Sequence, residues 1–409
     1  MISVSLRIKI AKWLDEYLGR MLIALVRSLR LGRRGANEQA APARILVIKF
    51  WGLGSIILLE PTLRRLRERF PSARLDFLTL TQNREVFALL PHVQRVHVLD
   101  FHHPLRFILN TVKSILHLRQ QRYDLIFDAE FFANFSALLA RLAAPQKLVG
   151  FSREHGHKRE LLDSAVPFHD DEHAAKNFLR LITLDSSCNA LRHSNKTMPR
   201  LQLAAHTHER IAGSYIVMNV NASPLALERR WPRENFVSLA RWLLHRYEIR
   251  LMLIGNTAER NHTQQIAAAL DDSKRVLNLA GTLSLRALAG LIHNAALFIS
   301  NDSGPLHLAA ALQKPVVGFY GPETPKRFGP LCERQLIFYL GLSCSPCMSV
   351  DNAKTVNCTN QLRCLRELRV LDVISPLQRF ITQHELLPLR AARSEVEVTP
   401  QLGVSPYAV

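Results

Sequence analysis

The sequence predicts an α/β protein made of two doubly wound, Rossmann-like domains that face each other across a cleft. Short apolar runs rich in β-branched residues alternate with helix-length segments from Arg44 onward, and the same alternation restarts at Tyr215. This pattern is typical of a parallel sheet with helices on both faces. The chain has 409 residues, of which 48% are hydrophobic, so it can form two cores of ordinary domain size.

The first domain begins with the apolar run 45–48, which is followed by Gly52 and Gly54 and then by a helical pattern over 56–70. Strand, glycine turn and helix in succession are typical of a ligand-binding edge. Further elements are expected as strands at 75–80, 96–98 and 124–127, with a helix over 104–121.

The second domain repeats the alternation. Strands are expected at 215–220, 249–254, 297–299 and 316–319, and helices at 232–247, 259–270, 285–294 and 304–312. We therefore divide the chain into an amphipathic helix and linker over 1–43, a first Rossmann-like domain over 44–205, a second Rossmann-like domain over 206–375, and a C-terminal helix with a disordered tail over 376–409.

The first forty residues indicate a basic amphipathic helix. They carry eight Lys or Arg and three Asp or Glu, and their apolar residues recur at helical spacing. Trp13 and Tyr17 are residue types that settle at a lipid headgroup boundary, so we expect this helix to lie on an anionic membrane surface. The alternative is that the apolar stripe packs on the protein's own core. The uncharged run Met21–Val26 is too short for a bilayer span or a signal peptide, which predicts a cytoplasmic protein, peripheral on the inner membrane face.

The chain is strongly basic. A net charge of +19 favours nucleotide phosphates, acidic lipid or nucleic acid as partners. Nucleic acid is disfavoured because the sequence contains no basic stripe interleaved with aromatic residues and no recognisable DNA-binding motif.

Six cysteines are too few and too clustered for a secreted disulfide scaffold, which favours a reducing compartment. Four of them are Cys344, Cys347, Cys358 and Cys364, and their spacing partly resembles a zinc site. The second pair has the wrong spacing for a common finger or ribbon, so we expect a structural loop and no metal. His155 and His157 line the acceptor face or are merely exposed.

The strongest candidate site follows the strand expected at 297–299. There Asp302, Ser303 and Gly304 stand where the strand turns into a helix, a position at which backbone N–H groups and the helix dipole favour a phosphate. The alternative is an ordinary polar helix cap.

This segment also resembles a known family. Residues 300–311, continued by 314–317 and Gly321-Pro322, closely resemble the nucleotide-binding signature of the lipopolysaccharide heptosyltransferases, glycosyltransferase family nine, and 49–55 and 123–128 are similar to the family's first glycine loop and mid-domain strand. The resemblance implies the GT-B fold and metal-independent, inverting transfer without a cofactor. It implies ADP-heptose or another nucleotide sugar as donor, and lipopolysaccharide core or another lipid-linked glycan as acceptor.

The resemblance also implies roles for individual residues. Asp302 would orient the donor sugar, while Arg229 stands where the family commonly has a lysine that stabilises the leaving group. Glu259 would bind the ribose, although it is also placed as a helix N-terminal acid. The full donor site implied in this way is Ser223, Glu259, Asp302, Ser303, Gly304 and His307.

One position departs from the family. Its first glycine loop ends in Gly-Asp, and that aspartate is taken as the general base, whereas this chain has Gly54-Ser55. An unassisted serine cannot accept the proton near neutral pH, so we expect Glu130, or else Glu60, to serve as the base. Two alternatives remain: a homologue that binds nucleotide sugar without transfer, and a nicotinamide oxidoreductase. The second is disfavoured because Gly52-x-Gly54 lacks the third glycine of that motif.

Overall fold

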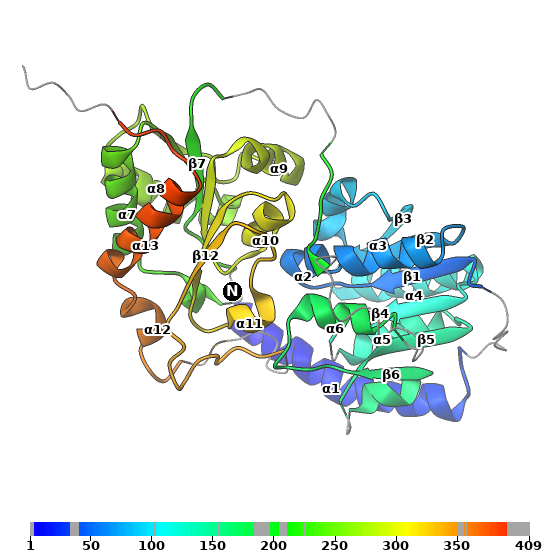
Figure 1. The fold of residues 1–409 in the computed structure, drawn as a ribbon. Helices are drawn as coiled ribbons and strands as arrows, with labels where there is room; N and C mark the ends of the chain where they lie inside the picture. Colours follow the sequence, from blue (N-terminus) through cyan, green and yellow to red (C-terminus); the bar gives the residue numbers. More distant parts are fainter. Residues whose placement is uncertain are drawn as a thin grey trace, which may run out of the picture.

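The structure is a computed structural model that describes residues 4–32, 41–100, 104–131, 133–153, 156–183, 197–203, 211–223, 226–350, 356 and 358–390. Two α/β domains lie side by side, and residues 197–203 lie between them (Figure 1). Each domain contains one six-stranded sheet.

The N-terminal domain has its strands in the order β3-β2-β1-β4-β5-β6, and all neighbouring strands are parallel. The strands are β1 (Arg44–Ile48), β2 (Arg74–Leu80), β3 (Arg95–Leu99), β4 (Leu125–Asp128), β5 (Lys147–Ser152) and β6 (Ser164–Pro167). The helices and 3₁₀ turns are α1 (Val4–Ser28), α2 (Leu53–Leu58), α3 (Glu60–Arg69), η1 (Thr81–Leu89), α4 (Pro104–Gln121), α5 (Asn134–Leu142), η2 (His157–Leu161) and α6 (Ala174–Arg180).

The C-terminal domain has its strands in the order β12-β11-β10-β7-β8-β9, again all parallel. The strands are β7 (Tyr215–Asn219), β8 (Arg250–Leu253), β9 (Val276–Asn278), β10 (Leu297–Asn301), β11 (Val316–Tyr320) and β12 (Gln335–Tyr339). The helices and 3₁₀ turns are η5 (Leu227–Arg229), α7 (Arg233–Arg246), η6 (Thr257–Glu259), α8 (Arg260–Leu270), α9 (Leu285–Asn294), α10 (Gly304–Ala311), α11 (Pro325–Phe328), α12 (Arg363–Arg366) and α13 (Val370–Gln383).

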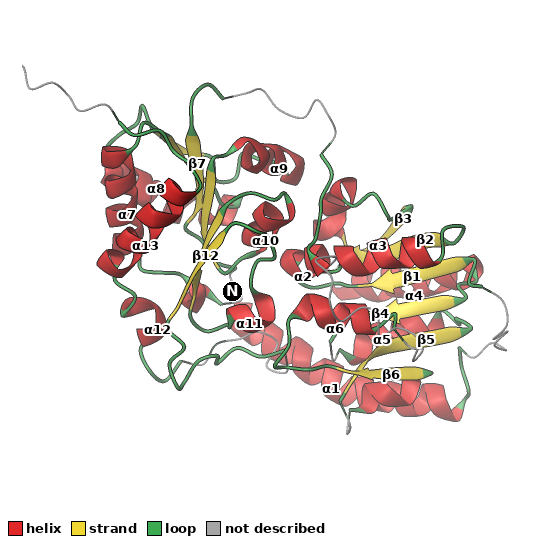
Figure 2. Cartoon of the chain, in the orientation of Figure 1, coloured by secondary structure: helices red, strands yellow, loops and turns green. Residues whose placement is uncertain are grey.

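Both sheets have the same topology. In each, the first strand of the domain lies beside the fourth, β1 beside β4 and β7 beside β10, with helices on both faces (Figure 2). The strand order reverses at these pairs, and ligands of doubly wound sheets bind beyond the carboxyl ends of the strands at such a point. The prediction of two doubly wound domains is therefore confirmed, and each sheet has one such reversal point.

Several elements differ from the sequence expectation. The helix expected over 56–70 is two helices, α2 and α3. Strands β5, β6, β9 and β12 were not predicted, and three of these four are edge strands. Edge strands are short and carry weaker apolar patterns because one side has no neighbouring strand.

The expected boundary between residues 375 and 376 falls inside α13. This helix buries Val373, Leu377 and Ile381 in the hydrophobic core of the C-terminal domain. Since one continuous apolar stripe runs through the whole helix, α13 belongs to that domain rather than to a separate C-terminal region.

Helix α1 packs on the N-terminal domain through a narrow face only. Ile23 and Val26 are buried against α5 and η2, and the Asp15 carboxylate accepts the backbone N–H groups of Asn134 and Phe135 at 2.9 and 2.8 Å, where α5 begins. The wider apolar face is exposed, and it comprises Trp13, Leu14, Tyr17, Leu18, Met21, Leu22, Leu25 and Leu29. The packing on the protein's own core is therefore confirmed for one face of the helix, and contact of the exposed face with a membrane stays a prediction. No helix in the described part of the chain is long and apolar enough to cross a membrane.

Candidate active site between the two domains

The donor-side motif lies where expected, between the end of β10 and the start of α10. Ser303 is the N-cap of α10, and the first N–H groups of a helix have no partner within the helix itself. Its hydroxyl does not cap the helix; it contacts the Ser300 hydroxyl at 2.8 Å and accepts a hydrogen bond from the Asn219 amide at 3.0 Å. Asn219 ends β7, so this network joins the two strands at the reversal point. The sequence analysis missed Asn219, although its position at a strand end was a usable signal.

Arg229 and Asp302 form an ion pair across this crevice, with Arg229 Nη1 3.3 Å from Asp302 Oδ2. The neighbouring Trp231 holds the arginine segment in place: its backbone N–H donates to Asn301 Oδ1 at 2.9 Å, and its buried ring stacks on Phe319. The sequence analysis brought Arg229 and Asp302 to one site, and the structure places them together.

Two guanidinium groups at this edge carry unsatisfied donors. The Nε atoms of Arg229 and Arg230 are buried and have no hydrogen-bond partner among the described residues. Burial lowers the pKa of Arg230, while the nearby Glu259 carboxylate opposes that shift. Buried donors without partners are costly, so this arrangement favours a ligand that brings acceptor oxygens, such as a phosphate.

Glu259 and Ser223 border the same edge. Glu259 Oε2 accepts a hydrogen bond from the Asn256 N–H at 2.8 Å, and the Glu259 N–H donates to Asn256 Oδ1 at 3.0 Å. These two bonds form a capping box, so Glu259 caps the start of a helix, which was the alternative considered for it. Burial raises the pKa of the Glu259 carboxyl, against its hydrogen bond with the Asn256 backbone and the charge of Arg230. Ser223 follows β7 and is partly buried.

The first glycine loop faces this donor edge from the other domain. Gly52 has a φ of +85°, a backbone conformation that favours glycine. Gly54 lies against the ring of His307, because a Cβ at Gly54 would be 2.4 Å from His307 Cδ2. Gly304 similarly lies close to Leu53, where an added Cβ would be 3.2 Å from the Leu53 Cβ. Helices α2 and α10 therefore meet at their N-terminal turns, and His307 is buried at this interface.

Glu130, which was expected to be the general base, is buried. It is 4% exposed, and its oxygens accept hydrogen bonds from Lys49 Nζ at 2.8 Å and from the backbone N–H groups of Phe50 and Trp51 at 2.6 and 2.9 Å. An ammonium and two backbone amides therefore occupy both oxygens of this carboxylate. Through these contacts Glu130 holds the start of the glycine loop, and its role as the base stays a prediction.

Glu60, the other candidate base, is also engaged. Its two oxygens contact His92 Nε2 at 3.2 Å and the Arg200 backbone N–H at 2.9 Å, and it is 1% exposed. Glu60 thus anchors the segment between the domains. Ser55, in place of the family's aspartate, is buried in α2.

A second buried ion pair lies beside Glu130. Lys158 Nζ is 2.8 Å from Asp128 Oδ2 and donates to the backbone oxygen of Glu130 at 2.6 Å. Burial raises the pKa of the Asp128 carboxyl, and the charge of Lys158 opposes the shift. The sequence analysis did not single out Lys49 or Lys158, because each is recognisable only from its partner on another strand.

The cysteine cluster converges in the fold. Cys344, Cys347, Cys358 and Cys364 line one cavity of about 40 Å³. The other residues that line this cavity are Pro322, Ser345, Thr359, Asn360, Leu362 and Arg363. In the described ranges, no three or more His, Cys, Asp and Glu side chains are arranged so that they could hold a metal ion. His157 is described and lies in η2, whereas His155 and Cys188 fall outside the described residues.

Comparisons with known proteins agree with this architecture. The model of Glycosyltransferase family 9 (heptosyltransferase) matches residues 112–356, more than half of the chain. Lipopolysaccharide heptosyltransferase 2 of Escherichia coli is 25% identical over 312 residues, covering 73% of this chain and 88% of that protein. Lipopolysaccharide heptosyltransferase 1 of Pseudomonas aeruginosa is 25% identical over 323 residues, covering 75% of this chain and 86% of that protein.

A solved structure of a heptosyltransferase has the same fold as this chain. The solved structure of E. coli ADP-heptose lps heptosyltransferase II superposes with a TM-score of 0.67 at 22% identity, covering 84% of this chain and 99% of that one. The GT-B fold expected from the sequence is therefore confirmed. The family match, together with the two doubly wound sheets and the contact of the glycine loop with α10, shows that this chain is a glycosyltransferase and belongs to family 9, the heptosyltransferase family.

Proposed function

We propose that the protein transfers a heptose or related sugar from a nucleotide donor such as ADP-heptose to lipopolysaccharide core or another lipid-linked glycan, with inversion at the anomeric carbon. The observation that carries this proposal is the donor edge: Arg229 pairs with Asp302 at the start of α10, and the buried Nε donors of Arg229 and of the adjacent Arg230 have no partner among the described residues. The names of the relatives supply the sugar and the acceptor class.

In this proposal the diphosphate of the donor binds at the N-terminus of α10. The backbone N–H groups of Ser303 and Gly304 and the positive end of the helix dipole attract its charge. Asp302 orients the sugar, Ser223 belongs with Arg229 to a second phosphate clamp, Glu259 contacts the ribose, and His307 lines the interface beside them.

Arg229 and Arg230 would stabilise the nucleoside diphosphate as it leaves. Their guanidinium groups can donate to phosphate oxygens in pairs, and they provide the positive charge that a divalent cation supplies in other transferases. We therefore propose transfer without a metal or cofactor. Glu130 acts in this scheme by holding the loop 49–54, on which the acceptor would lie.

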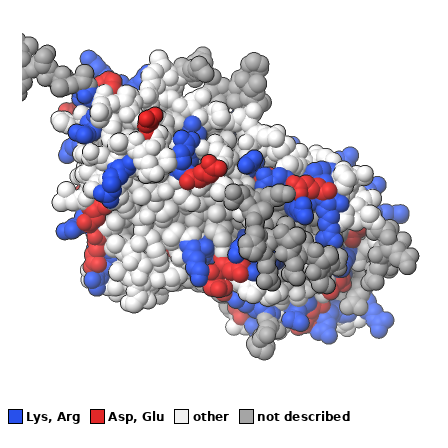
Figure 3. All heavy atoms as spheres, viewed as in Figure 1, with Lys and Arg blue, Asp and Glu red and all other residues white. Residues whose placement is uncertain are grey.

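We further propose that α1 holds the enzyme on the cytoplasmic face of the inner membrane. Its wide exposed face carries Trp13 and Tyr17 beside large aliphatic side chains, and the net charge of +19 favours an anionic surface. On the face seen in Figure 3, Lys and Arg are interspersed with Asp and Glu rather than gathered into one stripe.

The test is a transfer assay with the full-length chain. Purified protein is mixed with ADP-heptose and a lipopolysaccharide acceptor truncated before its heptoses, and the product is measured by mass spectrometry. A mass increase of one heptose, lost in Asp302→Ala, supports the proposal. Binding of ADP without any transfer would contradict it and favour a homologue that binds nucleotide sugar only. Full activity in the presence of a chelator is the outcome expected for a metal-independent enzyme.

A further inference from the structure

A pocket of about 170 Å³ lies between α1 and the segment that joins β5 to η2. It is outside the donor crevice, and none of the roles above uses it. The pocket is lined by Glu16, Arg20, Asn134, Ser152, Arg153, Gly156, His157 and Lys158. We propose that it binds an anionic group of the acceptor glycan, a phosphate or a carboxylate; this rests on the proposed function, because it assumes a charged, lipid-linked acceptor.

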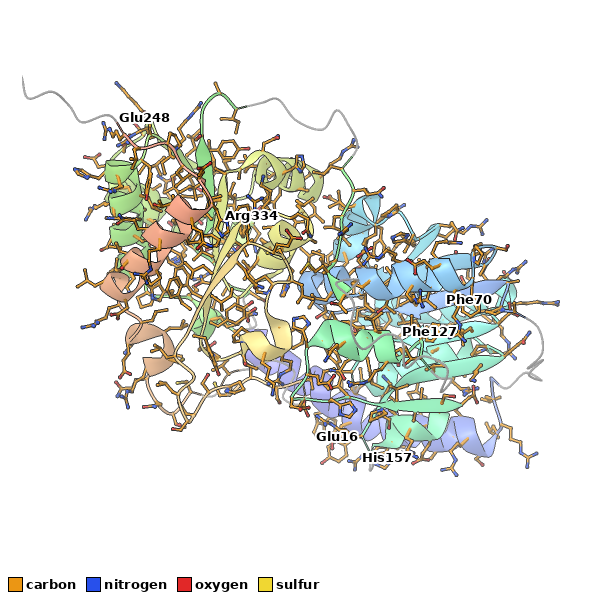
Figure 4. The ribbon with its side chains drawn as sticks, viewed as in Figure 1. Glu16, Phe70, Phe127, His157, Glu248 and Arg334 are labelled. Carbon is orange, nitrogen blue, oxygen red and sulfur yellow. The ribbon has the colours of Figure 1, made fainter. Side chains whose placement is uncertain are left out.

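The charges of the lining favour an anion. Three cations, Arg20, Arg153 and Lys158, face a single lining carboxylate, that of Glu16. Figure 4 shows Glu16 and His157 at the same end of the domain, on α1 and η2 respectively. A histidine in this position adds a further donor, and a positive charge when it is protonated.

The two arginines can change partners at little cost. Arg20 pairs with Glu16 at 2.9 Å and Arg153 pairs with Asp170 at 2.7 Å, and the side chains of both pairs are exposed to solvent. Exposed ion pairs contribute little to stability. A phosphate or carboxylate that enters the pocket can therefore compete for both guanidinium groups, which bind such anions through two parallel hydrogen bonds.

The floor of the pocket is rigid and is connected to the glycine loop. Lys158 is 2% exposed, pairs with Asp128 and donates to the backbone oxygen of Glu130. The Glu130 carboxylate in turn accepts the N–H groups of Phe50 and Trp51. A ligand in the pocket is thus held next to the acceptor side of the cleft, as a distal part of the acceptor would be.

Helix α1 completes the pocket and places it beside the exposed apolar face. Asp15 caps α5 and Ile23 is buried, which fixes α1 so that Arg20 lies at the pocket rim. Leu14 and Leu18, on the same helix, are exposed. If this face contacts lipid, the pocket opens close to the membrane surface, where the charged sugars nearest the lipid anchor would lie. Of the lining residues, Glu16 and Arg20 on α1 lie outside the segment 112–356 that the family model matches, and the other six lie inside it.

The pocket can be tested with a soluble probe. Glucose 6-phosphate is titrated into the full-length protein by calorimetry, with ADP present to occupy the donor crevice and glucose as the uncharged comparison. We expect glucose 6-phosphate to bind, glucose not to bind, and Arg20→Ala and Arg153→Ala each to weaken binding about tenfold or more, as expected for losing a charge-assisted hydrogen bond. Arg27→Ala is the matched control: it lies on the same helix and pairs with Glu160 but does not line the pocket, so binding should be unchanged.

The outcomes separate this proposal from the proposed function. Unchanged glucose 6-phosphate binding in both Arg20→Ala and Arg153→Ala would overturn the pocket. Loss of binding to phosphatidylglycerol vesicles in these variants, with glucose 6-phosphate unaffected, would also overturn it and would assign the arginines to a lipid headgroup. If wild type shows no sugar transfer but its probe binding still depends on Arg20, the anion site stands while the transferase assignment fails. A raised KM for the acceptor in Arg20→Ala, with the affinity for ADP unchanged, supports both.

Discussion

Gly54 of the N-terminal domain lies in direct contact with His307 of the C-terminal domain, so closely that a Cβ on Gly54 would stand 2.4 Å from His307 Cδ2. The contact joins the glycine loop of one crevice to the helix that begins at the other. A single methyl group at this point should therefore change how the two domains meet.

Gly54→Ala is expected to push α2 and α10 apart. Displacing reacting groups by about 1 Å can lower a rate about 100-fold, so turnover should fall strongly while the affinity for ADP changes little. Small-angle scattering measures the domain separation, and the midpoint of thermal unfolding measures the stability of the interface. Adding His307→Ala removes the clashing ring and should return both quantities toward their wild-type values. A single variant with wild-type scattering and turnover would show that the interface adapts without cost.

Glu130→Gln is expected to destabilise the fold, because it leaves the buried Lys49 ammonium without its counter-charge. Breaking a buried ion pair in this way typically costs about 3–5 kcal/mol, and urea unfolding measures the change. Glu68→Gln, which breaks an exposed pair with Arg65, should cost less than about 1 kcal/mol. Adding Lys49→Met should recover much of the loss. If Glu130→Gln is as stable as wild type yet inactive, Glu130 is the base after all.

Asp302→Asn is expected to impair donor use without unfolding the protein. It removes the counter-charge of Arg229 at the start of α10, so turnover should fall by a factor of about 10²–10³, the range seen when one preorganised electrostatic contact is lost. Calorimetry with ADP and a transfer assay report the two effects separately. Asp272→Asn breaks a similar aspartate–arginine pair, with Arg275, away from the cleft and should leave turnover unchanged. Normal turnover in Asp302→Asn would make this motif purely structural.

His173 is expected to make stability depend on pH. Its Nδ1 accepts the Ala175 N–H and its Nε2 donates to the Gly329 carbonyl of the other domain, so the folded protein holds the neutral ring. Burial lowers the pKa of His173 below its ordinary value of 6.5. The unfolded chain then binds the proton first, and the contribution of His173 to stability is lost as the pH falls below about 6.5. Unfolding midpoints at pH 5.5 and 7.5 should differ less in His173→Gln than in wild type; an equal difference would refute the assignment.

Met21→Glu combined with Leu25→Glu is expected to weaken binding to phosphatidylglycerol vesicles. Both side chains lie on the exposed face of α1, and each buried apolar side chain contributes about 1.5–3 kcal/mol, so affinity should drop tenfold or more. Leu371→Glu, which alters an equally exposed leucine on α13, is the control and should bind normally. Vesicle binding that survives the double substitution would exclude α1 as the contact.

The sequence determined the local architecture because periodicity and turn residues act over short distances. The alternating strands and helices, the glycine loop and the run Asp302-Ser303-Gly304 could all be located without a structure, since each is written in consecutive residues. The edge strand β3 was expected at 96–98, whereas the edge strands β6, β9 and β12 were not, because the burial of an edge strand depends on a single neighbouring strand.

The tertiary structure alone decided which polar side chains are held by ion pairs and hydrogen bonds to distant parts of the chain. Lys49 and Glu130 are 81 positions apart, and their ion pair ties the residue expected as the base to the glycine loop. Asp15 caps a helix that begins 119 residues later, which fixes α1 in place and divides its apolar residues into a buried face and an exposed one. Such contacts depend on how sheets and helices pack. Packing brings together residues that are far apart in the sequence, and their spacing does not predict the contact.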